Sequence, residues 1–101
     1  MITGTLSSGF KYNIDETIAD EWEFTRAIGL SESKKQGEKL YGMTQVISML
    51  LGSEGEEELI KHIKKNNNGK CTSEHMYAAI VELLKTIKDE KELKNSESSP
   101  E

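Results

Sequence analysis

Three side chains in this sequence could do chemistry through a thiol or an imidazole, namely Cys71, His75 and His62. Cys71 and His75 are four residues apart, and His62 could approach from a preceding helix, so that three soft donors would meet. Three such donors suit zinc, but zinc needs a fourth ligand or an open position with catalytic neighbours, and the sequence shows neither. A hydrophobic cysteine and two surface histidines explain these residues better than a metal site does.

Cys71 and His75 could also form a nucleophilic pair. The sequence, however, contains no glycine-rich oxyanion turn, no serine elbow and no phosphate-cradling loop. Its acidic residues are accounted for by helix starts and solvated helix faces. We therefore expect no catalytic residue, no cofactor and no metal. A thiol or metal-dependent enzyme is the least favoured of three functional classes.

The turn Asn66-Asn67-Asn68-Gly69 has the Asn-x-Asn-Gly spacing of a calcium loop. With Gly69 in the sixth position, the first position falls on Lys64 and the twelfth on His75, where calcium needs carboxylates. A tight turn in front of a capped helix is the better explanation.

The charge of the chain argues against two classes of partner. Its 101 residues include 13 basic and 18 acidic side chains, for a net charge of −5. Phosphate backbones and anionic lipids would be repelled, so we expect neither nucleic acid nor membrane as a partner. No apolar run approaches the roughly 20 residues of a membrane span, and no signal peptide is visible. We therefore expect a cytoplasmic protein, whose one cysteine cannot form an internal disulfide.

The longest helical pattern covers residues 72–94, and the other elements are expected to cover its apolar side. Thr72 is a suitable N-cap, and Glu74 lies in the positively charged first turn. Apolar residues recur every three or four positions at Met76, Tyr77, Ile80, Leu83, Leu84 and Ile87. This spacing predicts a buried amphipathic helix.

Residues 1–14 alternate between apolar and polar side chains on either side of Ser7-Ser8-Gly9. The alternation predicts two strands, and a glycine in third place of a three-residue loop suits the left-handed conformation of a hairpin. Two strands alone are marginally stable in water, so their apolar side must pack on helices or pair with another chain.

Four helices are expected after the hairpin, over residues 15–28, 40–51, 53–65 and 72–94. Asp15 caps the first helix, and Gly52 separates the second from the third. Residues 31–39 lack apolar spacing and are expected to form an exposed connection.

The predicted fold class is therefore α+β, mainly α, with an N-terminal β-hairpin followed by about four helices. A single compact domain is expected over residues 1–94, made of a hairpin (1–14) and a helical part (15–94). Residues 95–101 offer no apolar side chain for burial, so they are expected to form a disordered C-terminal tail.

Trp22 and Phe24 are the aromatic residues of the first predicted helix. Ile18 and Trp22 form one apolar stripe, and Phe24 and Ile28 form another, so the apolar surface is wider than one flat contact needs. Either the helix is wedged between two layers, or part of it awaits a partner. We favour the wedged arrangement because small domains bury their few aromatic side chains.

Several short motifs follow one another along the chain, namely Ile2-Thr3-Gly4, Ser8-Gly9-Phe10, Ile14-Asp15-Glu16, Asp20-Glu21-Trp22-Glu23-Phe24, Leu50-Leu51-Gly52 and Asn68-Gly69-Lys70-Cys71. Their order resembles that of the tail assembly chaperones of phages and prophages of Gram-positive bacteria. An acidic helix start after the fifth motif and the final amphipathic helix complete the pattern. The resemblance covers roughly residues 1–90, and the order of the motifs is more specific than any one of them.

The resemblance implies a non-enzymatic protein of the host bacterial cytoplasm that binds the long, largely helical tape-measure protein. It would keep this client soluble and help to bring tail-tube protein subunits around it. Trp22 and Phe24, with Met43 behind them, are the expected partner-binding residues, because aromatic side chains dominate interface energies. A homo-oligomer is compatible with the resemblance. The alternative is a structural tail completion or connector protein that adds a strand to its neighbours through the N-terminal hairpin.

Overall fold

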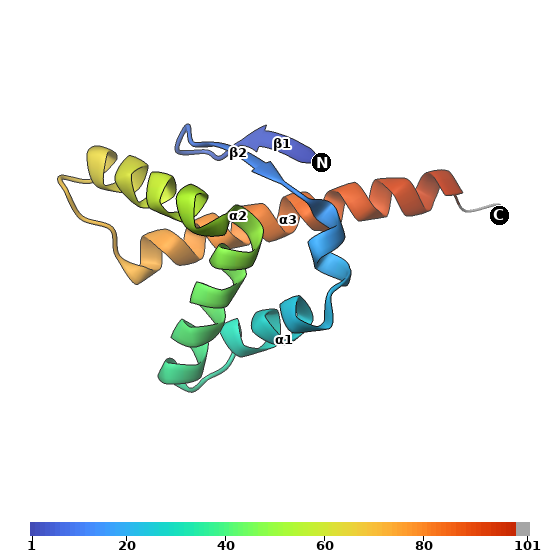
Figure 1. The fold of residues 1–101 in the computed structure, drawn as a ribbon, viewed down its shortest axis with the longest axis horizontal. Coiled ribbons are helices and arrows are strands. Elements are labelled where there is room, and N and C mark those ends of the chain that lie inside the picture. The colour runs from blue at the N-terminus through green and yellow to red at the C-terminus, as the bar shows by residue number, and fades with distance from the viewer. Residues whose placement is uncertain (99–101) are drawn as a thin grey trace.

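The computed structural model of the chain describes the backbone of residues 1–98 and the side chains of residues 1–90. Its elements follow in the order β1 (Ile2–Thr5), β2 (Lys11–Ile14), the 3-10 helix η1 (Glu16–Asp20), α1 (Trp22–Ser31), α2 (Gln36–Asn66) and α3 (Ser73–Ser98). In Figure 1, α3 crosses the molecule horizontally, the hairpin lies above it, and α1 and the start of α2 lie below it. The predicted class is confirmed in its main features, a mainly helical chain with an N-terminal antiparallel hairpin.

The hairpin has the register that its apolar pattern predicts. Ile2 pairs with Ile14, and Leu6 N donates to the Phe10 carbonyl oxygen at 2.8 Å to close the loop. These four side chains are at most 9% exposed. Gly9 has the expected left-handed conformation, with φ of 97°.

Polar contacts hold the hairpin loop on the helices. Ser7 N and Ser7 Oγ both donate to the Glu82 carboxylate of α3, at 2.9 and 2.7 Å. The Nε2 atom of His62 in α2 lies 2.9 Å from the Ser8 carbonyl oxygen, which can only accept. The two-stranded sheet is therefore stabilised from below by both apolar and charged contacts.

The first predicted helix is divided into two elements. The Asp15 carboxylate caps η1 by accepting from Thr17 N (3.0 Å) and Thr17 Oγ1 (2.7 Å), and these bonds lower the pKa of the carboxyl. Glu21 is extended, with φ of −76° and ψ of 134°, and separates η1 from α1. The prediction of a continuous helix over residues 15–28 is therefore wrong. The sequence could not reveal the break, since no glycine or proline marks it.

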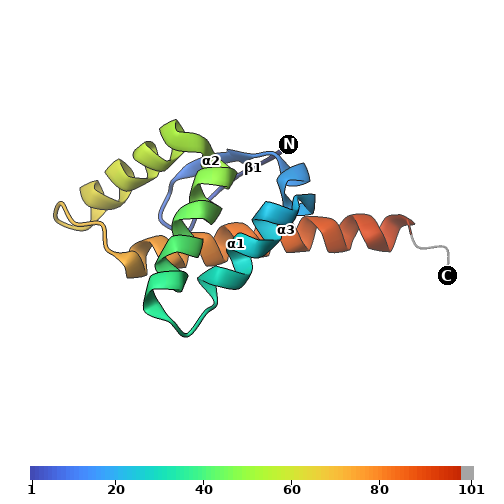
Figure 2. The same ribbon diagram turned by 60° about the horizontal axis from the view of Figure 1, so that its bottom comes forward.

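The α2 helix changes direction at Gly52, whose φ of 75° and ψ of 171° are accessible without strain only to glycine. We call residues 36–51 the first arm and residues 53–66 the second arm. Figure 2 shows the arms diverging from their junction as an inverted V. The sequence predicts a boundary at Gly52, but no loop intervenes, so residues 1–98 form three α-helices instead of about four.

The exposed connection predicted for residues 31–39 is shorter in the structure. Ser31 still belongs to α1, and α2 already begins at Gln36. Ser33 Oγ donates to Glu38 Oε1 at 2.7 Å and so ties the connection to the first turn of α2. Because this turn is exposed, it carries no apolar spacing, and periodicity could not reveal it.

The helical part extends past its predicted end at residue 94, because α3 runs to Ser98. Residues 95–98 were expected in the tail, yet neither glycine nor proline interrupts the helix before Pro100. The rest of the predicted tail, 99–101, lies outside the described residues.

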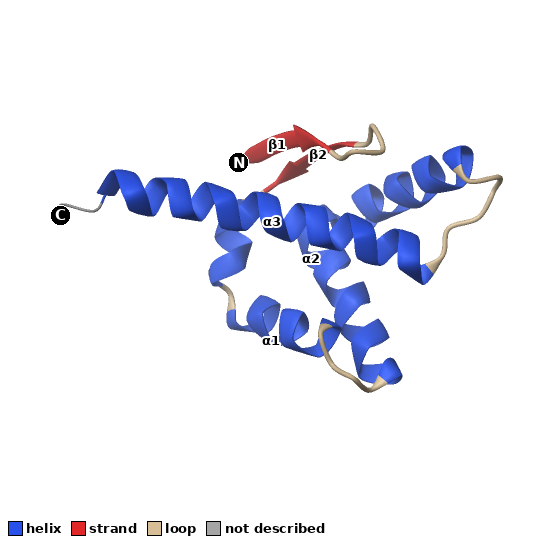
Figure 3. Ribbon diagram, turned by 180° about the vertical axis from the view of Figure 1, so that it is seen from behind, coloured by secondary structure: helices blue, strands red, loops and turns tan. Residues whose placement is uncertain are grey.

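One apolar cluster joins the hairpin, α1, both arms and α3. Seen from behind in Figure 3, α3 lies across α2. The largest fully buried side chains are Ile14, Phe24, Val46, Ile47, Leu59, Ile80 and Leu83. Ile80, Leu83 and Ile87 of the pattern predicted for residues 72–94 are thus buried, whereas Tyr77 of the same pattern is 38% exposed.

Close packing of α1 on the first arm generates a stability prediction. A Cβ atom at Gly42 would collide with the backbone nitrogen of Ser31 and lie 2.7 Å from the Ala27 carbonyl oxygen. Because these are backbone atoms, we predict that Gly42→Ala lowers the free energy of unfolding by about 1–3 kcal/mol in urea denaturation. Gly29→Ala is the matched control, since nothing lies within 4 Å of its Cβ, and it should raise stability by up to about 1 kcal/mol. Equal effects of the two substitutions would contradict the close contact.

Candidate functional site

The thiol and the two imidazoles serve structural roles. His75 N donates to Thr72 Oγ1 (3.2 Å), and Thr72 N donates to His75 Nδ1 (3.1 Å), so the two residues cap α3 reciprocally. His62 holds the hairpin loop, and Cys71 packs against the core. Within the part of the chain that the structure describes, no three His, Cys, Asp or Glu side chains are placed to hold a metal ion. The structure therefore does not bring Cys71, His62 and His75 together as a zinc site.

Cys71 is a partly buried thiol. Burial raises the pKa of Cys71, and the nearby Lys64 ammonium opposes this effect only in part. The reactive form of cysteine is the thiolate, which a raised pKa disfavours at neutral pH. This environment is typical of a packing residue and not of an activated nucleophile.

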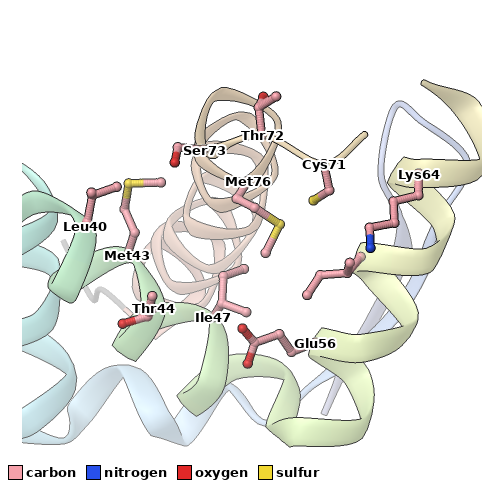
Figure 4. Close-up of a pocket in the computed structure, with 11 residues that line it drawn as sticks. Leu40, Met43, Thr44, Ile47, Glu56, Lys64, Cys71, Thr72, Ser73 and Met76 are labelled. Atoms are coloured by element: carbon pink, nitrogen blue, oxygen red, sulfur yellow. The ribbon is translucent and has the colours of Figure 1, made fainter. Parts of the chain in front are cut away.

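An apolar groove lies between the two arms of α2 and the start of α3 (Figure 4). We call it the α2–α3 groove, and its volume is about 350 Å³. It is lined by Leu40, Met43, Thr44 and Ile47 of the first arm, Glu56, Ile60 and Lys64 of the second arm, and Cys71, Thr72, Ser73 and Met76 at the start of α3. The bend at Gly52 creates the groove, because two collinear arms would leave no angle between them.

The floor of the groove is apolar and adaptable. Ile47 and Met43 are 1% and 5% exposed, and Met76 is partly buried. Figure 4 shows the Ile47 and Met76 side chains pointing toward each other, with Met43 beside Leu40 at the adjoining end. Unbranched methionine side chains can adjust to different apolar surfaces, which suits a surface that accepts a variable partner.

A second concavity of about 370 Å³ continues the groove, because it shares Leu40, Met43 and Ser73 with it. Lys39 Nζ lies 4.8 Å from the centroid of the Tyr77 ring at this end, in a cation–π contact. Leu40 and Tyr77 remain 36% and 38% exposed despite their size. The groove therefore opens onto an apolar rim that a partner could cover.

The three expected partner-binding residues lie in different environments. Trp22 is 73% exposed at the start of α1, whereas Phe24 is 1% exposed in the core and Met43 forms part of the groove floor. Trp22 and Phe24 are two residues apart on one helix, so their side chains differ by roughly 200° about the helix axis and lie on nearly opposite faces. Phe24 as a surface anchor is therefore wrong, and the exposure of Trp22 contradicts the wedged arrangement of the first helix.

The sequence interpretation missed Glu56 and Lys64 as groove residues, because both were explained by the helix dipole. The signal was their spacing: Glu56, Ile60 and Lys64 follow one another at four-residue intervals and so share one ridge of the second arm.

Comparisons of the chain with protein families, with curated proteins and with solved structures find no match. Among the residues that the structure describes, no helix combines the length and apolarity needed to cross a membrane. The function must therefore be inferred from the groove, its rim and the motif order of the sequence.

The environment of Cys71 generates a prediction about reactivity. Because burial raises the pKa of its thiol, Cys71 should react with a neutral disulfide reagent at pH 7.5 more slowly than free glutathione does, and unfolding in urea should remove the difference. Absorbance of the released thiolate measures both rates, and Cys71→Ser provides the blank. If Cys71 in the folded protein reacted far faster than free glutathione does, the result would support a thiol enzyme.

Proposed function

We propose that this protein is a non-enzymatic phage tail assembly chaperone that binds an amphipathic helix of the tape-measure protein in the α2–α3 groove. The supporting observation is an open apolar groove between three helical segments with a methionine-containing floor. The identity of the client comes from the resemblance of the motif order.

A helix is the occupant that this groove favours. Its walls are themselves helices, and a helix laid between them can insert apolar side chains at three- and four-residue spacing. Ile60 and Met76, which are only partly buried, would receive these side chains, and the exposed Leu40 and Tyr77 would cover the next turn. A long helical tape-measure protein offers repeated segments of this kind.

Charge supports a chaperone role in the host bacterial cytoplasm. The net charge of −5 keeps the protein and its complexes in solution, while the groove covers apolar client surface. In this proposal the protein holds the client until tail-tube protein subunits enclose it, and it leaves before the virion is complete.

The free edge of the hairpin favours one alternative, a tail completion or connector protein. The closing pair Leu6–Phe10 is hydrogen-bonded, so the alternating register directs the backbone groups of Thr3 and Thr5 away from β2. Both residues are largely exposed, and such an edge can accept a strand from a neighbouring subunit. A connector stays in purified virions, whereas a chaperone is absent from them.

A charge placed on the groove rim tests the proposed function. Leu40→Glu should weaken binding of helical tape-measure segments by at least about tenfold in isothermal titration calorimetry, because a carboxylate would be buried without a partner. Val81→Glu is the matched control, since Val81 is 47% exposed and does not line the groove. Equal losses for the two variants, both still folded by circular dichroism, would refute binding in the groove.

Trp22 is retained in the proposal as a contact outside the groove. Trp22→Ala should weaken the same binding by roughly twofold to tenfold and leave the free energy of unfolding nearly unchanged, because the side chain is 73% exposed. Phe24→Ala should instead lower the free energy of unfolding by about 3–5 kcal/mol, because it empties a core position. Unchanged client binding by the Trp22 variant would remove this residue from the interface.

A further inference from the structure

Two opposite charges flank the apolar wall of the α2–α3 groove. Glu56 and Lys64 both line it, with Ile60 between them. Within the described part of the chain, neither side chain forms an ion pair or a hydrogen bond. The two charges are therefore available to a partner and are not satisfied by the fold.

The charges lie at different ends of the groove. In Figure 4, Glu56 is beside Ile47, near the junction of the arms, and Lys64 is on the side of Cys71. The effect of Lys64 on the pKa of Cys71 agrees with this placement. Eight residues of α-helix separate the two charges, which corresponds to about 12 Å along the axis.

The two ends of the groove differ in charge. The first turn of α3, which begins at Ser73, lies beside Leu40 and Met43 in Figure 4, across the groove from Lys64, so the basic end rests on Lys64 itself. The groove thus has an acidic end at Glu56 and a basic end at Lys64, joined by an apolar floor.

We infer that the groove selects helices that carry a basic and an acidic residue about eight positions apart, on either side of an apolar stripe. The inference rests on the proposed function and specifies the chemistry of its client. The basic residue of the client would face Glu56, and its acidic residue would face Lys64. Apolar contact would supply most of the affinity, whereas the two charge pairs would set the register and reject helices with like charges.

The test uses three synthetic helical peptides of about 20 residues with one leucine stripe. They differ only at two positions eight residues apart, which are Lys and Glu, Glu and Glu, or Lys and Lys. The wild-type protein should bind the Lys/Glu peptide roughly threefold to tenfold more tightly than the other two in fluorescence anisotropy. The preference should shrink at 0.5 M salt, because salt screens partly exposed charges.

Charge reversal in the protein should redirect this preference. Glu56→Lys should favour the Glu/Glu peptide, and Lys64→Glu should favour the Lys/Lys peptide. Glu57→Lys and Lys61→Glu are matched controls, because they make the same changes in net charge at exposed positions outside the groove, and they should keep the wild-type ranking. Circular dichroism and urea denaturation establish that each variant is folded.

The outcomes separate this inference from the proposed function. Equal binding of the three peptides, or unchanged rankings in the groove variants, would overturn charge selection and leave groove binding intact. If neither the peptides nor tape-measure segments bind, the proposed function itself fails. A homodimer that Glu56→Lys dissociates in analytical ultracentrifugation would assign the groove to a second copy and overturn the inference.

Discussion

The bend of α2 at Gly52 is the constraint on which the rest of the structure depends. Its backbone conformation, with φ of 75° and ψ of 171°, turns one long helical segment into two arms without a loop. Val46 and Ile47 of the first arm and Leu59 of the second can then enter the same core as α3. The inner side of the same angle is left uncovered and becomes the α2–α3 groove. Fold and candidate site thus have one origin, and a side chain at position 52 would strain both.

The thiol and the imidazoles lie apart from one another, whereas one acidic and one basic side chain share the groove. The residues most capable of chemistry are used to stabilise the fold: His75 caps α3, His62 holds the hairpin loop, and burial raises the pKa of Cys71. Glu56 and Lys64, which form no ion pair or hydrogen bond with the side chains that the structure describes, are separated along one ridge and flank apolar surface. Such an arrangement can orient a bound segment, because charge pairs contribute specificity and apolar contact contributes affinity.

Much of the fold could be predicted from local patterns in the sequence. Alternation in residues 1–14, the cap at Asp15, the break at Gly52 and the apolar spacing after Thr72 each have a local cause that the structure retains. The extended Glu21 and the exposed first turn of α2 could not be predicted, because neither a glycine or proline nor apolar spacing marks them. The candidate site was predicted only in part. Met43 lies in the groove, but Phe24 is buried, since burial depends on which helix face the tertiary packing covers.

Protection of Cys71 tests the central claim most directly. Cys71 is the only cysteine in the chain, and it lines the α2–α3 groove, so its labelling rate reports whether the groove is occupied. The rate of modification by a thiol reagent should be measured with and without a saturating, cysteine-free helical segment of the tape-measure protein. If the segment binds in the groove, the labelling rate should fall at least about tenfold, because most protein molecules would carry a bound segment at saturation. If a segment binds while the labelling rate of Cys71 stays unchanged, the client does not bind in the groove and must bind at another surface.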